Sequence, residues 1–161
     1  SYEGKQTMIV PFMNDALAEN PIADTHGVGH LNPDYVRFEE LDVLVVHAQL
    51  SPGQRHLYES RTFYFLDGQP GLLVYQDMFD GNQELMRTYM QTHVVGGLGG
   101  SGMTSDDICN VQGEYTFDFA TRTYSGGNIM GEAIQPRPPI FNGEEKAVSF
   151  YTPDGLRRYA R

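Results

Sequence analysis

The sequence predicts a mainly β protein built around an antiparallel meander sheet, and its composition favours a sheet over a helix bundle. The 161 residues include 10 Tyr and 9 Phe, and aromatic residues are enriched in strands. The 18 Gly and 9 Pro supply many turn positions, and no segment has the long helical periodicity of a bundle. A chain of this length is the size of one domain, so we expect residues 1–161 to form a single domain.

The two ends of the chain are expected to be irregular. Residues 1–34 hold several prolines and glycines, which interrupt regular structure, so we expect an extended arm lying over the core. Residues 125–161 are expected to form a Pro-rich tail that closes with a short helix, where Thr152 is a candidate N-cap and Pro153 the first helical residue. The sheet is therefore expected within residues 35–124.

Strands are expected between these ends, because β-branched and aromatic residues alternate there with polar ones. The expected strands are Glu40–Leu50, Arg55–Leu66, Leu72–Phe79, Glu84–Val95 and Glu114–Tyr124. Short turns join the first four, which makes the meander antiparallel. A Gly-rich connection, residues 96–113, precedes the last strand and has a length that is typical of mobile or functional loops.

The segment Gln76–Val94 carries enough titratable residues to raise the question of an active site. Asp80 and Gly81 are expected to supply the positive φ angles of a tight hairpin turn, which accounts for Asp80 without any chemistry. Asp77 and Arg87 are expected to meet across this hairpin as an exposed pair. Turn and strand rules thus explain these residues, and we interpret the segment as one corner of a sheet.

The charge and composition of the chain exclude several classes of protein. The formal net charge is -10, so the summed field repels phosphate backbones, and no basic stripe is present that would bind nucleic acid. Cys109 is the one cysteine, so no disulfide can form within the chain. The sequence contains no run of about 18 apolar residues and no N-terminal signal segment.

Metal binding and catalysis are weakly indicated. His26 and His30 are four residues apart, and Asp34 or His47 would complete a three-ligand set. The glycines of THGVGH argue against the helix that this spacing needs, so we expect no metal. No G-x-S-x-G elbow or phosphate-binding loop is present, and two acids before Cys109 disfavour a thiolate. We expect no cofactor and no catalytic residues, and a His-dependent metal enzyme is the weaker alternative.

Several segments, in order along the chain, resemble a bacterial family of uncharacterised proteins described as outer-membrane lipoprotein-sorting proteins, related to the LolA/LolB-like group. The segments that carry the resemblance are GHLNPD at Gly29–Asp34, LSPGQRHLYESRTFYF at Leu50–Phe65, DMFDGNQELMR at Asp77–Arg87, YTFDFATRTYSGG at Tyr115–Gly127 and YTPDGLRR at Tyr151–Arg158. Members of that family are longer, and the part matched is their C-terminal portion.

The resemblance implies a strongly curved antiparallel sheet, part of a LolA/LolB-like half-barrel. Its concave face would form a hydrophobic cavity for acyl chains or another lipid-like ligand. It also implies a location in the periplasm or at the outer membrane, with possible peripheral contact with that membrane, and a role as a non-enzymatic carrier. Concave apolar sites with a few polar groups are the usual way of holding such ligands.

The apolar strand faces are the expected ligand-binding surface. The residues we expect to contact the ligand are Tyr58, Tyr64, Met86, Met90, Tyr115, Phe117 and Phe119. The alternative for each residue is that its side chain packs the core. An alternative function is an assembly module, in which a sheet edge pairs with the missing N-terminal portion or with a second copy.

Overall fold

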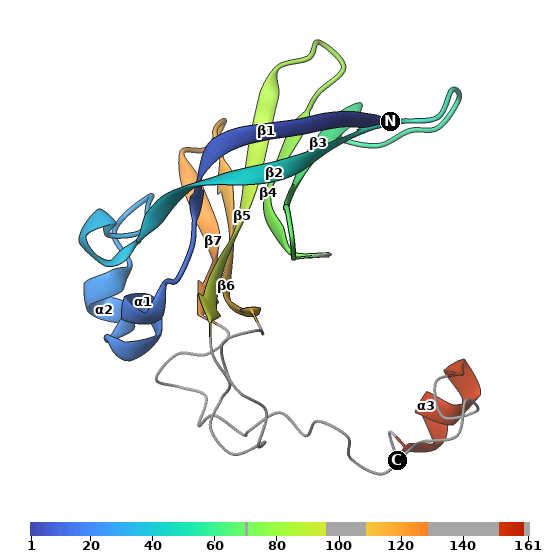
Figure 1. The fold of residues 1–161 in the computed structure, drawn as a ribbon. Coiled ribbons are helices and arrows are strands. Elements are labelled where there is room, and N and C mark those ends of the chain that lie inside the picture. The colour runs from blue at the N-terminus through green and yellow to red at the C-terminus, as the bar shows by residue number, and fades with distance from the viewer. Residues whose placement is uncertain (70, 96–108, 129–151, 160–161) are drawn as a thin grey trace.

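The computed structural model describes residues 1–69, 71–95, 109–128 and 152–159, which include a curved antiparallel sheet (Figure 1). The seven strands lie in the order β1-β2-β3-β4-β5-β6-β7, so each strand pairs with its neighbours in the sequence. The predicted mainly β meander is therefore confirmed. The strands are β1 Tyr2–Pro11, β2 Phe38–Gln49, β3 Ser60–Leu66, β4 Leu73–Phe79, β5 Leu85–Val95, β6 Cys109–Asp118 and β7 Thr123–Asn128.

Strand β1 lies where the sequence predicted an irregular arm, and that prediction is wrong for these residues. β1 pairs with β2 in antiparallel register from Pro11↔Phe38 onward, with a register shift near Gly4. Its sequence, YEGKQTMIVP, lacks a sustained alternation of apolar and polar residues of the kind that indicates a strand, and only Val10 and Pro11 are buried. Pairing with β2, rather than local propensity, forms this element.

Short helical segments follow β1 and connect it to β2. They are the helix α1 (Asp15–Glu19), the helix α2 (Ile22–Thr25) and the 3-10 helix η1 (Pro33–Tyr35). The side chain of Asn32 accepts a hydrogen bond from the backbone N–H of Asp34 at 3.2 Å, which starts η1. This connection lies beside one end of the sheet, near β6 (Figure 1).

The β4–β5 hairpin turns at Asp80, but not through the positive φ angles that the sequence predicted there. The positive φ, 64°, belongs to Gln83, and Gly81 does not adopt one. The Asp80 carboxylate instead accepts hydrogen bonds from the backbone N–H groups of Asn82 at 2.8 Å and Glu84 at 2.9 Å. Asp80 is thus a structural residue of the turn, for a different reason from the one expected.

The expected strand Glu114–Tyr124 is in fact a hairpin of two strands, β6 and β7. The turn between them contains Arg122, whose φ is 55°. Strand β6 also takes in residues 109–113, which the sequence assigned to the Gly-rich connection. The rest of that connection, residues 96–108, lies outside the described residues.

The start of β3 differs from the prediction, and the start of α3 agrees with it. β3 begins at Ser60, and residues 55–59 belong to the β2–β3 connection. The helix α3 (Pro153–Tyr159) begins at the proline that the sequence predicted. Most of the predicted Pro-rich tail, residues 129–151, lies outside the described residues.

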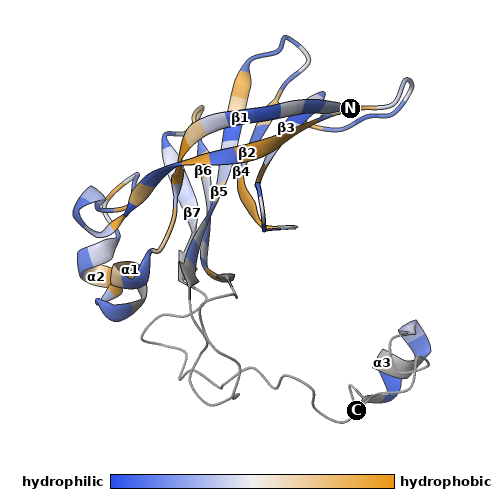
Figure 2. Cartoon of the chain, in the orientation of Figure 1, coloured by the Kyte–Doolittle hydropathy of each residue, from blue (hydrophilic) through white to orange (hydrophobic). Residues whose placement is uncertain are grey.

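Two apolar clusters lie on one side of the sheet, which we call the inner face; the other side is the outer face. The first apolar cluster consists of Val10, Val43, Val45, Leu66 and Val74. β1 contacts β4 and β5 although neither strand is its neighbour in the sheet, so the sheet curls toward the inner face. Figure 2 shows the hydrophobic stretch of β2, which contributes Val43 and Val45 to this cluster, whereas β7 is largely hydrophilic.

A second apolar cluster lies on the same inner face, over β5 and β6. It consists of Leu17, Leu31, Met90 and Tyr115, which are at most 7% exposed. The two leucines come from the connection between β1 and β2, and the other two residues come from β5 and β6. The segment 12–37 therefore covers the inner face at this end of the sheet.

Candidate functional site

The inner face carries a half-buried polar group on β3, β4 and β5. Asp77 and Thr88 lie opposite one another in the register, and the Asp77 carboxylate accepts a hydrogen bond from Thr88 Oγ1 at 2.6 Å. Tyr64 OH donates to the same carboxylate at 3.2 Å. Arg87, the predicted partner of Asp77, is instead paired with Asp118, with Nε and Oδ2 2.7 Å apart. The predicted pair of Asp77 and Arg87 is wrong. Arg87 is adjacent to Thr88 in β5, so its side chain points to the opposite face of the sheet from Asp77.

The phenols beside Asp77 are held in their neutral form. Burial, and secondly the charge of Asp77, raise the pKa of Tyr64 to about 12. Tyr75 lies opposite Tyr64 in the register, and the same two causes raise its pKa to about 12. At neutral pH both hydroxyls therefore act as hydrogen-bond donors and not as bases. This group can orient a polar part of a ligand.

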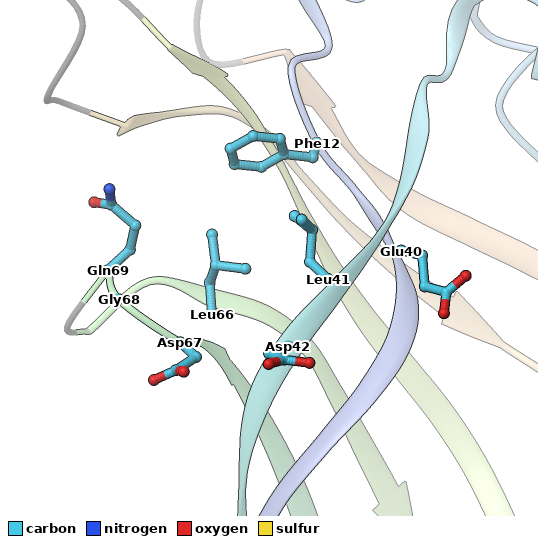
Figure 3. A pocket seen from close by; sticks show the side chains of 8 residues that line it. All are labelled: Phe12, Glu40, Leu41, Asp42, Leu66, Asp67, Gly68 and Gln69. Carbon is cyan, nitrogen blue, oxygen red and sulfur yellow. The ribbon is translucent and has the colours of Figure 1, made fainter.

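A hollow of about 580 Å3 opens at the end of the inner face, where β1 and β2 meet the β3–β4 turn. Figure 3 shows the side chains of Phe12, Leu41 and Leu66 pointing toward this space. Leu66 belongs to the first apolar cluster, and the other two side chains pack against that cluster. The apolar wall of the hollow is thus continuous with the core, and the volume of the hollow lies within the roughly 300–1,000 Å3 typical of small-molecule sites.

Carboxylates form the rim of this hollow. Glu40, Asp42 and Asp67 line it, and Lys5 Nζ lies 3.2 Å from Asp42 and 2.6 Å from Asp67. The hydrogen bonds that Asp42 accepts from the Thr7 hydroxyl and from Lys5 lower the pKa of that carboxyl. Because the carboxylates outnumber the single ammonium, the rim favours a neutral or cationic group over an anionic one.

The connection between α2 and η1 is held on the inner face by aromatic contacts. The rings of His26 and Tyr124 stack with centroids 6.3 Å apart, and Tyr124 OH donates to the Gly27 carbonyl at 3.2 Å. His26 also lies 5.7 Å from the ring of Tyr115. Burial lowers the pKa of His26 and raises the pKa of Tyr115 to about 12. These rings are packing groups of a covered surface.

A buried polar group lies where β5 meets β6 and the segment after β1. Asn14, Thr92, His93 and Gln112 are each at most 1% exposed. The Asn14 N–H donates to the His93 carbonyl at 2.7 Å, and Thr92 Oγ1 donates to Gln112 Oε1 at 2.5 Å. Neither ring nitrogen of His93 has a hydrogen-bond partner of good geometry. Burial lowers the pKa of His93 to about 4, against a weaker opposing effect of nearby backbone groups, so the ring is neutral.

Comparison with known proteins identifies the family of this chain. Residues 1–157 match the family model described as "Protein of unknown function (DUF1329)". The chain belongs to the DUF1329 family. It is similar to Uncharacterized protein PA3922 of Pseudomonas aeruginosa, with 36% identity over 87 residues, and the match covers 53% of this chain and 19% of that protein. No solved structure matches the chain.

The seven ligand-contact residues predicted from the sequence fall in different places in this DUF1329 chain. The inner face brings together Tyr64, Met90, Tyr115 and Phe117. Met86 lies at the register irregularity between β4 and β5, and Phe119 is 51% exposed after the end of β6. Tyr58 precedes β3, and its hydroxyl accepts a hydrogen bond from Arg87 Nη1 at 2.8 Å on the outer face. Tyr58 and Phe119 therefore lie away from the inner-face group.

The residues that line the hollow were not singled out by sequence reasoning. Phe12 falls in a segment without periodicity, and Leu41 precedes the clearest apolar alternation of β2. Leu66 carried a usable signal, because it alternates with Tyr64 along β3. Only the curl of the sheet brings these side chains to one space.

The histidines of the predicted metal set do not gather in the DUF1329 chain. Within the described ranges, no group of three His, Cys, Asp or Glu side chains could hold a metal ion. His26 contacts aromatic rings, and His30 is exposed with Nδ1 2.7 Å from the Leu31 carbonyl oxygen. No helix in the same ranges has the length and apolar character needed to cross a membrane.

Proposed function

We propose that this DUF1329 chain is a non-enzymatic binding module that carries a lipid-like molecule, or the acyl chains of a lipoprotein, on its inner face. The observation that carries the proposal is the hollow of about 580 Å3, whose apolar walls continue the first core cluster. A curled sheet with one apolar face and one open end suits reversible burial of an elongated apolar ligand.

The expected energetics suit a carrier that both binds and releases. Each buried CH2 contributes about 0.8 kcal/mol, so a segment of about eight methylenes gives roughly 6 kcal/mol of favourable transfer free energy. Part of this gain is offset by the free-energy cost of association, so the net affinity is smaller than the transfer free energy and a competing apolar site can take the ligand.

The polar groups of the site favour a ligand with a neutral head. The rim of the hollow is acidic, with Glu40 beside the Lys5-bridged carboxylates of Asp42 and Asp67. The Asp77 group on the same face could hold one hydrogen-bonding part of the ligand. An esterified acyl chain would meet both conditions, whereas a free fatty acid would place a carboxylate against the rim.

The resemblance to outer-membrane lipoprotein-sorting proteins of the LolA/LolB-like group supports the same proposal. We propose a location in the periplasm or at the outer membrane, where acylated cargo must cross an aqueous space. A protein that shields acyl chains from water removes the main cost of that crossing.

The first experiment compares native and denatured masses of protein purified without detergent. Extra mass that is lost on denaturation and identified as lipid is the expected result. Absence of bound lipid, together with failure to bind a fluorescent acyl ester added in vitro, would refute the carrier proposal.

A pair of variants then tests the position of the ligand. Phe12→Asp places a charge at the wall of the hollow, whereas Phe38→Asp places the same charge on a residue of β2 that is 47% exposed. We expect Phe12→Asp to weaken binding of the acyl ester at least tenfold, and Phe38→Asp to bind within about twofold of the original protein. Equal binding by the two variants, with unchanged melting temperatures, would remove the hollow from the proposal.

A second candidate function, an assembly module, is favoured by the edges of the sheet. In the described part of the chain, no strand pairs with the outer edge of β1 or of β7. β1 has ten residues, and its Tyr2 and Ile9 are 64% and 65% exposed. Long exposed edges are usually covered in natural proteins, either by a partner strand or by a second copy. A species at twice the chain mass, free of lipid, would favour this function over the carrier.

A further inference from the structure

We propose that the outer face carries a binding site for an oxyanion, formed by the guanidinium of Arg61 and the imidazole of His56. The site lies beside the β2–β3 connection, on the side of the sheet opposite to the apolar clusters. It does not depend on the carrier function. The ligand class is a phosphate or phosphate monoester, either free or as the head group of a lipid.

A hollow of about 260 Å3 provides the space for this ligand. Arg61, His56 and Tyr58 line it, and Ala48 lies directly opposite Arg61 in the β2–β3 register. The alanine side chain is too short to fill the surface beside the guanidinium, so the space between β2 and the connection stays open. The ligand would therefore contact Arg61 from the β2 side.

The hydrogen bonding of His56 determines which ring nitrogen carries the proton. The backbone N–H of Tyr58 donates to His56 Nδ1 at 3.0 Å, so Nδ1 acts as the acceptor. In the neutral ring the other nitrogen, Nε2, must then carry the hydrogen. His56 thus presents an N–H donor to the hollow in its neutral form as well as in its charged form.

Two donors then face one another across a short distance. Arg61 Nη2 lies 3.5 Å from His56 Nε2. A guanidinium has five N–H donors and no acceptor, so these two nitrogens cannot bond to each other. An oxygen atom with negative charge that contacts both would satisfy both donors, and an Arg fork matches phosphate geometry well.

The guanidinium of Arg61 has no ion-pair partner among the described residues. Arg87, in contrast, is paired with Asp118. Glu59 also lines the hollow; its carboxylate accepts a hydrogen bond from Gln49 Nε2 at 2.9 Å and is not paired with Arg61.

The ring of Tyr58 holds the guanidinium of Arg61 in place. The Arg61 Cζ atom lies 5.2 Å from the centroid of that ring. Stacking of this kind orients a guanidinium without neutralising it. Arg61 is thus preorganised and remains available to an anion.

The test titrates the full chain with inorganic phosphate at constant ionic strength and follows the side-chain NMR signals of arginine and histidine. Signals of Arg61 and His56 are expected to shift together and to saturate. Arg61→Gln keeps the length of the stem and removes the charge, and it is expected to weaken phosphate binding about ten- to a hundredfold. The matched control is Arg55→Gln, because Arg55 is exposed and does not line the hollow.

A second arm separates a lipid head group from free phosphate. The same proteins are mixed with vesicles of phosphatidic acid and with vesicles of phosphatidylcholine, and bound protein is measured by flotation. Phosphate binding that depends on Arg61 supports a site for free phosphate, and Arg61-dependent binding to phosphatidic acid alone supports a lipid head group. If Arg61→Gln matches Arg55→Gln in both arms and all variants keep the original melting temperature, the proposed site is refuted.

Discussion

Replacing His93 with methionine should remove much of the loss of stability that this protein suffers between pH 7 and pH 5. The His93 ring is 0% exposed and neither of its nitrogens has a hydrogen-bond partner of good geometry. Methionine is apolar, flexible and of similar volume, so it can occupy the same space without a titratable group. At pH 7 the substitution should change the free energy of unfolding by no more than about 1.5 kcal/mol.

The size of the effect follows from the shift in the pKa of His93. Burial lowers this pKa from 6.5 to about 4 in the folded protein. The unfolded chain therefore binds the proton more readily between these values, and stability falls as the pH drops below about 6.5. Each unit of pKa difference corresponds to about 1.4 kcal/mol, so moving from pH 7 to pH 5 costs the folded protein about 2 kcal/mol.

Urea unfolding of the original protein and of His93→Met at pH 7 and pH 5 measures this difference. The original protein should lose about 2 kcal/mol more than the variant between the two pH values. Asp118, whose pKa is lowered to about 2 by the Thr121 backbone N–H and by Arg87, titrates below this range in both proteins. His30→Met, at an exposed position, is the control and should keep the original pH dependence. Parallel pH profiles for the original protein and His93→Met would contradict the reasoning.

Two further substitutions test the packing of the inner face and of the last hairpin. Leu17→Ala should lower the free energy of unfolding by about 2–5 kcal/mol, because Leu17 is 0% exposed in the second cluster, whereas Val28→Ala, at a 100% exposed residue, should have little effect in the same denaturation assay. Gly126→Ala should destabilise the β6–β7 hairpin, because φ is +146° and the added Cβ would lie 2.0 Å from the Glu114 carbonyl oxygen. Gly127→Ala, whose Cβ meets no atom within 4 Å, should leave amide hydrogen exchange of the hairpin unchanged.

Most of the meander could be predicted from the sequence because its signals are local. Alternating apolar residues and compact turns specified β2 to β5, whose boundaries the structure places within a few residues. Local rules failed for β1, whose pairing residues lie between 27 and 44 positions away. They also failed at the β6–β7 turn, because no glycine or proline marks residues 119–122.

The candidate site was less predictable than the fold. Strand alternation shows that Tyr64 shares a face with Leu66, but it does not show which other strand supplies the wall opposite them. Phe12 reaches the hollow only because the sheet curls. Tyr58 belongs by alternation to the face of Tyr64, yet it precedes β3 and its hydroxyl meets Arg87 on the outer face. Residues outside a strand do not follow its alternation.

The sequence by itself determined the class of the sheet, the order of its hairpins and the start of the C-terminal helix, because each depends on neighbours within about a dozen residues. The tertiary structure decided which side of the sheet is covered, since Leu17 and Leu31 reach Met90 and Tyr115 from a distant part of the chain. It also decided where the hollow opens and which charges face it. These features depend on the curvature of the sheet and on contacts between residues that are distant in the sequence, so no local sequence pattern predicts them.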